Sequence, residues 1–253
     1  RKGASPALAH ALWGAEVMPL GGTGKLSIAD ITRWSQSTGK VINARLTTGQ
    51  SAYQLTGMTR PQDLSAQMQL FTAFATDPGF RPELGDKLQA IAPMMAGQIA
   101  GNAGAVFRRA VTLQMAGGDA RFGELPDDAE LAKTTPQDLP ALLGPALAEP
   151  ADVVIVGDVT VEAAIRATQD TLGAVARTPR APAPQVHIAI APRAEPVVAL
   201  HNGRADQAFY GVYWPLPDYF ADPRLSHVAD VAAAVLSARL IDTVREKRGM
   251  TYS

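Results

Sequence analysis

The chain has 253 residues, of which 47% are hydrophobic and 19% are charged, and its formal net charge is −1. This near-neutral charge gives no general attraction to a phosphate backbone, so we expect no nucleic-acid partner. The chain has no cysteine, which excludes disulfides, thiolate metal ligands and a cysteine nucleophile. No apolar run approaches the roughly 20 residues of a membrane span, so we expect no membrane partner. Together these values predict a globular chain of one large or two ordinary domains.

The first informative segment, residues 5–25, predicts a short helix followed by a glycine-rich turn. Ser5 and Pro6 are typical of a helix start, because serine caps free N–H groups and proline fits the first helical position. The turn is similar to a phosphate-binding loop. However, Pro19 and Leu26 stand where that loop needs glycine and then serine or threonine. We therefore interpret the glycines as a turn without a nucleotide.

A helix and a pair of strands are predicted next. Ser27 begins a helix that extends to about Thr38, and Gly39 is placed to end it. Residues 41–48 and 52–59 alternate partly at period two, which predicts an antiparallel pair.

The middle of the chain is predicted to be mainly helical. Thr59–Gln62 and Thr134–Gln137 both match a capping box, which predicts a helix start at each place. Between them, residues 82–115 predict one long helix, loosened by Pro93 and by several glycines. Residues 119–133 are polar and predict a loop.

Strands reappear in the prediction for the last third of the chain. Residues 151–158 predict a short buried strand, and Thr160 begins a helix that extends to about residue 176. The proline-rich residues 177–184 mark a linker. Further strands are predicted beyond the linker, at residues 185–191, 197–201 and 207–216.

A long helix is predicted from about Asp222 or Pro223, and it ends in the segment Thr243–Ser253. Its basic last turn complements the negative end of the helix dipole, and Gly249 is placed for a left-handed cap. Apolar residues recur along it at spacings of three and four: Leu225, Val228, Ala232, Val235, Leu236, Leu240 and Val244.

Two side chains at this helix end, Arg245 and Tyr252, can act as a pair. A helix end followed by a chain reversal brings a guanidinium and a phenol to the same side, where both can donate to one substrate oxygen. The residues alone also fit a capped helix with an exposed arginine and a half-buried tyrosine.

The segment Arg245-Glu-Lys-Arg-Gly-Met-Thr-Tyr-Ser253 resembles a motif of the M16 (insulinase and pitrilysin) zinc peptidases. The motif belongs to the non-catalytic half, where an arginine and a tyrosine at this spacing reach the zinc site of the other half and hold the substrate. The resemblance implies that Arg245 and Tyr252 bind peptide substrate.

Residues 7–14, Ala-Leu-Ala-His-Ala-Leu-Trp-Gly, resemble the family's Gly-Leu-x-His-x-x-Glu-His helix without its chemistry. His10 matches the first zinc ligand, Trp13 replaces the general-base glutamate, and Gly14 replaces the second histidine. The third family ligand is a glutamate on the following long helix, but residues 87–118 contain no Asp or Glu. A hydrolytic zinc site needs three protein ligands and a water. We therefore expect no metal or other cofactor in this chain, zinc in the catalytic half, and a structural role for His10.

The resemblance covers nearly the whole chain and implies an α+β fold. Each M16 domain has two layers, a mostly antiparallel sheet with helices on one face. Residues 1–176 match one domain, whose first strands we expect to be missing, and residues 185–253 match the first part of a second domain. Gly39–Ala44 resembles a strand that binds peptide by strand addition in the active half.

The function implied is that of a non-catalytic, substrate-holding half of an M16 zinc metallopeptidase. Its partners would be a peptide substrate and a catalytic half, in the same polypeptide or in a separate subunit. This chain alone is expected to be inactive, because it lacks H-x-x-E-H. A second hypothesis stays open, an inactive M16-like scaffold or peptide-binding subunit without a proteolytic role. The compartment is open, although bacterial relatives are often periplasmic, which favours the periplasm over the cytoplasm.

Overall fold

The structure is a computed structural model that describes residues 5–49, 52–179, 188, 190, 195–217, 219–247 and 249. Its contacts divide the chain into two units, Arg1–Phe209 and Tyr210–Ser253. The linker predicted at 177–184 lies mostly outside the described residues, and the predicted domain boundaries remain a prediction. None of the helices in the described part combines the length and the apolar character that a membrane crossing requires.

The first unit opens with two short 3₁₀-helices, η1 (Pro6–Ala11) and η2 (Gly14–Gly21). The Ser5 hydroxyl accepts a hydrogen bond from the N–H of Ala7 at 3.3 Å, so the predicted cap is confirmed. Gly22 ends η2 with φ 68°, a conformation that a residue with a Cβ rarely adopts. The glycines are therefore a turn, as expected.

Helix α1 (Ile28–Thr38) has the predicted bounds. The Ser27 hydroxyl accepts from the N–H of Asp30 at 3.1 Å, and the Asp30 carboxylate accepts from the N–H of Ser27 at 3.1 Å. This reciprocal pair satisfies two N–H groups that the helix itself leaves free. Gly39 ends α1 in the left-handed region, at φ 64°.

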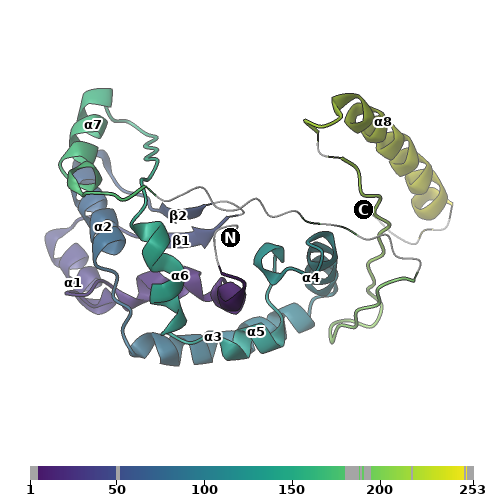
Figure 1. The fold of residues 1–253 in the computed structure, drawn as a ribbon, viewed down its shortest axis with the longest axis horizontal. Coiled ribbons are helices and arrows are strands. Elements are labelled where there is room, and N and C mark those ends of the chain that lie inside the picture. The colour runs from purple at the N-terminus through teal and green to yellow at the C-terminus, as the bar shows by residue number, and fades with distance from the viewer. Residues whose placement is uncertain are drawn as a thin grey trace. The chain divides into compact units, whose positions relative to one another are not determined.

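The predicted hairpin is confirmed as β1 (Arg45–Thr48) and β2 (Tyr53–Thr56), which pair antiparallel with Leu46 opposite Leu55 (Figure 1). The strands are shorter than predicted because the preceding segment pairs with a side chain. The Gln67 amide accepts from the N–H of Asn43 at 3.1 Å and donates to its carbonyl at 2.7 Å. A side-chain amide thus takes the place of a neighbouring strand.

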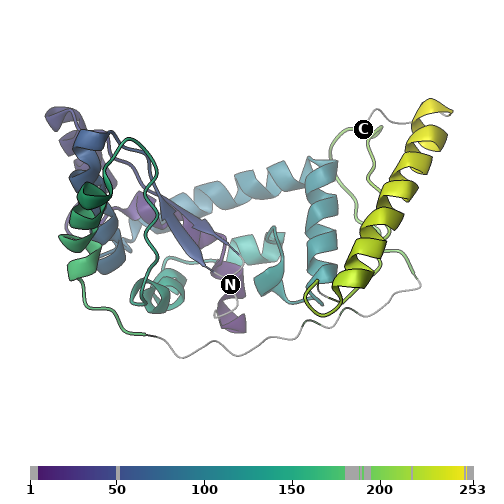
Figure 2. The same cartoon turned by 90° about the horizontal axis from the view of Figure 1, so that it is seen from above.

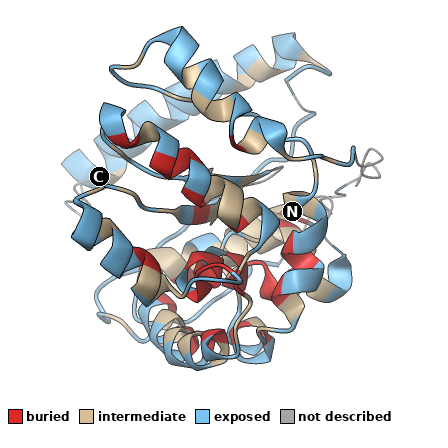
Figure 3. Cartoon of the chain, turned by 90° about the vertical axis from the view of Figure 1, so that its left-hand side faces the viewer, coloured by how far each residue is buried: buried red, intermediate tan, exposed pale blue. Residues whose placement is uncertain are grey.

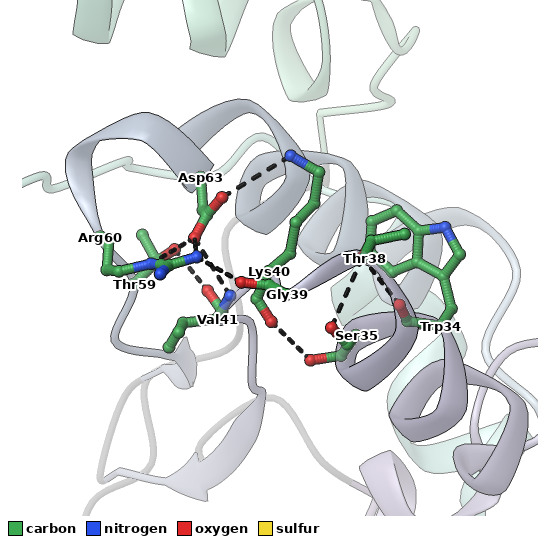
Figure 4. Close-up of polar contacts among 9 residues, drawn as sticks. All are labelled: Trp34, Ser35, Thr38, Gly39, Lys40, Val41, Thr59, Arg60 and Asp63. Carbon is green, nitrogen blue, oxygen red and sulfur yellow. Dashed lines mark hydrogen bonds and ion pairs between the residues drawn. The ribbon is translucent and has the colours of Figure 1, made fainter.

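A polar cluster around Asp63 ties this segment to the next helix (Figure 4). The Asp63 carboxylate accepts from the N–H of Val41 at 3.1 Å and from Nε of Arg60 at 2.7 Å. The hydrogen bond from Val41 is the main cause that lowers the pKa of Asp63. The Thr59 hydroxyl donates to the Val41 carbonyl at 2.6 Å and caps no helix, so the predicted capping box is wrong. A 3₁₀-turn, η3 (Pro61–Asp63), leads into α2 (Leu64–Thr76) instead.

The long helix predicted at 82–115 is wrong, because the chain forms α3 (Glu83–Ala100) and α4 (Ala103–Met115) with a sharp change of direction between them (Figure 2). The Asn102 side chain caps α4 by accepting from the N–H of Ala105 at 2.9 Å. A later segment also packs at the break, where the N–H of Asn202 donates to the Ala100 carbonyl at 2.7 Å. Asparagine competes with helix continuation because its side chain satisfies a first-turn N–H.

The segment 119–133, predicted as a loop, contains the 3₁₀-turn η4 (Ala120–Phe122) and helix α5 (Asp128–Lys133). A capping box between Asp127 and Glu130 starts α5. Helix α6 (Asp138–Leu147) follows, but Thr134 does not cap it. The Asp138 carboxylate instead accepts from the backbone and hydroxyl of Thr135, both at 2.8 Å, so the second predicted capping box is also wrong.

The strand predicted at 151–158 is absent from the described structure, and Val154 and Val156 are 83% and 91% exposed. An apolar run forms a strand only when a neighbouring strand supplies its hydrogen bonds, and no described segment pairs with this one. Thr160 does cap α7 (Val161–Gln169), as predicted, but the helix is shorter than expected and a 3₁₀-turn, η5 (Leu172–Ala174), follows it.

The core of the first unit lies between the helices and one face of the hairpin (Figure 3). Leu46 is 1% exposed, and its cross-strand partner Leu55 packs against the same cluster. The α+β prediction, with helices on one face of an antiparallel sheet, is therefore confirmed. The buried members of this cluster are Ala11, Leu12, Ala15, Met18, Ile31, Leu46, Leu70, Phe74, Leu142 and Leu143.

The second unit contains the predicted long helix, α8 (Pro223–Leu240), and a π-helix, η6 (Ile241–Glu246). The Asp222 carboxylate caps α8 by accepting from the N–H of Leu225 at 2.9 Å. None of the residues of α8 is buried.

The strands predicted at 197–201 and 207–216 are not formed in the described residues, since neither segment has a pairing partner there. Most of the strand predicted at 185–191 lies outside the described residues.

Candidate functional site

The three residues of the altered zinc motif lie in and between the first two helices. His10 belongs to η1, Gly14 begins η2, and Trp13 stands just before η2. The Trp13 indole N–H donates to the Thr134 hydroxyl at 2.8 Å. That hydroxyl donates in turn toward the His10 carbonyl at 2.7 Å and the Glu130 carbonyl at 2.9 Å. Trp13, which the resemblance sets at the position of the family's general-base glutamate, is therefore held as a structural donor.

The His10 ring has a protein partner. Its Nε2 lies 3.3 Å from the Asp138 carboxylate, and only 16% of the His10 side chain is exposed. Burial raises the pKa of Asp138, but hydrogen bonds from Thr135 and His10 outweigh it and leave the pKa below its ordinary value. One of the two ring nitrogens that can bind a metal, Nε2, is thus engaged with this carboxylate.

Gly14 has no room for a ligating side chain. A Cβ added there would lie 2.9 Å from Cγ2 of Thr134 and 3.4 Å from Cδ2 of Leu88. Within the described part of the chain, no group of three or more His, Asp or Glu side chains is arranged to hold a metal ion. The residues present at the altered motif do not fit a zinc ion, which needs three convergent ligands.

A cavity of about 130 Å³ lies beside Trp13, and its lining includes Glu16, Thr48 and Glu130. Burial raises the pKa of the Glu130 carboxyl more than its hydrogen bond from Asp127 lowers it. Glu16 accepts from the N–H of Thr48 at 3.0 Å. The family pattern gave no reason to select Glu16 or Thr48, because the contact joins residues 32 positions apart in the sequence.

The second candidate site is the end of α8, where the helix widens into η6. The N–H of Lys247 donates to the Asp242 carbonyl, five residues back, at 3.1 Å. Gly249 has φ 59° and its N–H donates to the Arg245 carbonyl at 3.0 Å, so the predicted left-handed cap is confirmed. π-helical turns occur frequently at functional sites. The sequence pattern predicted the end of the helix but not its widening.

Arg245 is available to a ligand at this end. Half of its side chain, 49%, is exposed, and its Nε lies 3.5 Å from a carboxylate oxygen of the adjacent Glu246. Such an exposed pair between neighbours is weak. Tyr252 lies outside the described residues, so its predicted position near Arg245 remains a prediction.

Comparison with protein-family models matches residues 148–253 to the family described as the peptidase M16 inactive domain. The matched region includes both Arg245 and Tyr252. The M16 resemblance is confirmed. The matched region is the last two fifths of the chain. Comparison with curated proteins gave no match.

Solved M16-type folds resemble the chain at low sequence identity. A Helicobacter pylori protease has a TM-score of 0.54 at 15% identity, with 74% of this chain and 44% of that chain covered. The periplasmic protease PqqL of Escherichia coli has a TM-score of 0.53 at 16% identity, with 72% and 21% covered. The ferredoxin protease FusC, solved as a mutant with Arabidopsis ferredoxin, has a TM-score of 0.52 at 16% identity and the same coverage. This chain spans 21% to 44% of the length of these solved chains.

Proposed function

We propose that this chain is part of the non-catalytic half of an M16 zinc metallopeptidase and that it holds the peptide substrate. The observation that carries the proposal is the inactive-domain match, which extends through the arginine and tyrosine of the helix end. Hydrolysis would take place on a catalytic half with H-x-x-E-H and zinc, in the same polypeptide or in a separate subunit. A catalytic site outside this chain agrees with the altered motif, where His10, Trp13 and Gly14 do not fit a metal.

In this proposal Arg245 anchors the peptide through its guanidinium, and Tyr252 donates a hydrogen bond to the carbonyl at the bond that is cleaved. The exposed guanidinium of Arg245 supports an interaction with a carbonyl or carboxylate. The similarity to FusC, a ferredoxin protease in complex with ferredoxin, supports a polypeptide ligand. The similarity to a periplasmic protease supports the periplasm as the compartment.

The test is Tyr252→Phe in the complete peptidase that includes this chain and its catalytic half. Loss of one donor to a developing oxyanion typically lowers kcat by about 10²- to 10³-fold, so we expect a loss in that range. Tyr213→Phe is the matched control, because Tyr213 is a half-exposed tyrosine outside the helix end. Peptide hydrolysis is measured under steady-state conditions for both variants.

A second hypothesis, an M16-like scaffold or peptide-binding subunit without proteolytic function, predicts a different outcome. If Tyr252→Phe keeps the kcat and KM of the wild type, the substrate-holding role is wrong and the scaffold hypothesis is favoured. The complete sequence of the protein and its partner gives an independent test. Without an intact H-x-x-E-H and a downstream glutamate in either one, the peptidase assignment fails.

A further inference from the structure

At the outer edge of β1, the carboxylate of Glu16 accepts a backbone N–H that an added strand could otherwise use. In an antiparallel pair, successive residues turn their backbone groups alternately to the neighbouring strand and away from it. The N–H of Gly49 donates to the Ala52 carbonyl at 2.9 Å, so Gly49 and every second residue before it face β2. Leu46 and Thr48 therefore turn their backbone groups to the outer edge, away from β2.

Glu16 occupies this outer edge. Its Oε1 accepts the Thr48 N–H at 3.0 Å, and the Thr48 hydroxyl lies 3.4 Å from the Leu12 carbonyl, which it can donate to. Glu16 is exposed, whereas Leu46 is 1% exposed and anchored in the core. The strand is thus fixed, and the carboxylate that covers it is free to move into solvent.

A cavity of about 130 Å³ lies on the same side and is lined by Glu16 and Thr48 together with Leu12 and Trp13. An unpaired strand edge is a template for another extended chain, and proteins protect such edges with charged side chains. A carboxylate also repels the carbonyl oxygens that an added strand would bring to the edge.

We propose that Glu16 is an internal cap that keeps extended peptides from adding to the outer edge of β1. The cap occupies the Thr48 N–H, which is one of the donors that an added strand would need. This role is independent of the substrate-holding role proposed for Tyr252, because it concerns the first unit alone. It also means that β1 does not bind peptide by strand addition at this edge while Glu16 is in place.

The first test measures hydrogen exchange of the Thr48 amide by NMR. Glu16→Ala removes the acceptor, and we expect exchange at Thr48 to become about tenfold faster, the change that follows from loss of one hydrogen bond to a charged group. Glu16→Asp keeps the charge but shortens the side chain, so it should also expose the amide. Glu16→Gln keeps an oxygen at the same reach, so exchange should stay close to that of the wild type.

The second test uses a synthetic peptide with the sequence of residues 52–59, which already contains a strand that pairs with β1. The Glu16→Ala and Glu16→Asp variants are expected to bind this peptide, with shifts of the Leu46 and Thr48 resonances. The wild type and the Glu16→Gln variant are expected not to bind it. Unchanged exchange of the core amides of Ile31 and Leu143 verifies that each variant is folded. Thr48 exchange that does not rise in Glu16→Ala, or equal peptide binding by the wild type, would overturn the proposal.

Discussion

The altered zinc motif and the end of α8 both carry residues that match family motifs, but their surroundings differ. At the motif, the ring of His10 faces Asp138 and the indole of Trp13 faces Thr134, and both side chains are largely enclosed. At the helix end, Arg245 is half exposed and pairs only with its neighbour Glu246. Side chains whose polar groups are satisfied internally stabilise the fold, while exposed polar groups remain available to a ligand.

This contrast teaches that the fold fills the space around the altered motif with its own contacts. Thr134 illustrates this filling, because its hydroxyl joins the Trp13 indole to the His10 carbonyl and its methyl group lies against Gly14. Restoring a ligand by substitution must therefore break an established set of contacts.

The largest expected effect comes from Gly14→His, which restores the second histidine of the motif. Its Cβ would lie 2.9 Å from Cγ2 of Thr134 and 3.5 Å from Cδ2 of Leu139, and the ring would extend further into the core. Overpacking of this kind typically costs about 3 kcal/mol at its upper range, so we expect the free energy of unfolding to fall by about that amount. Urea denaturation measures the change.

Gly97→Ala is the control for that substitution. Gly97 lies inside α3, and an added Cβ would have no neighbour within 4 Å. Alanine is favoured over glycine in a helix interior by about 0.8–1.0 kcal/mol, so this variant should be more stable than the wild type. A Gly14→His variant that is as stable as the wild type would mean that the motif is open and that our description of its packing is wrong.

A smaller effect is expected for Trp13→Phe. The substitution removes the indole N–H that donates to Thr134, and a buried hydrogen bond contributes about 1 kcal/mol. A double-mutant cycle with Thr134→Val isolates the contact, and we expect a coupling energy of about 1 kcal/mol.

At the other site, Arg245→Ala should change the free energy of unfolding by less than about 0.5 kcal/mol, since its contacts are exposed. Equal costs at both sites would remove the distinction between them.

The sequence predicted the local starts and ends of helices better than the arrangement of strands. Ser27 acts through its hydroxyl on a residue three positions away, and Gly39 and Gly249 act through their own backbone, so the local sequence suffices to place them. The segment at 151–158 has the composition of a strand, but a strand depends on a partner that composition does not specify. The break after α3 was missed for a related reason, because the segment around Asn202 packs there from far along the chain.

The same difference between local signals and contacts of distant residues applies to the candidate sites. The motifs at His10 and Arg245 were found from residue order, because a family motif is a local pattern. The roles of Thr134 and Glu16 could not be found that way, since each acts on a residue that is distant in the sequence. No local spacing relates Thr134 to Trp13, 121 residues earlier.

The smallest expected effect separates the two regions by their response to acid. The pKa of Asp138 is lowered below its ordinary value of 3.8, so this carboxylate stabilises the folded state when it is ionised. Its contribution is present above the pKa of the unfolded chain and is lost as the pH falls through the lower pKa of the folded state. Asp138→Asn should therefore be less stable than the wild type at pH 7, and the difference should shrink below about pH 3.8.

Asp242→Asn is the matched substitution at the helix end. Asp242 lies 2.6 Å from Nζ of Lys247, but 60% of its side chain is exposed, and water screens such a pair. Thermal unfolding followed from pH 7 to pH 3 should give parallel curves for Asp242→Asn and the wild type, and converging curves for Asp138→Asn and the wild type. If the Asp242 curve converges as strongly as the Asp138 curve, the ion pair at the helix end also supports the fold, and its charges are less available to a ligand than we infer.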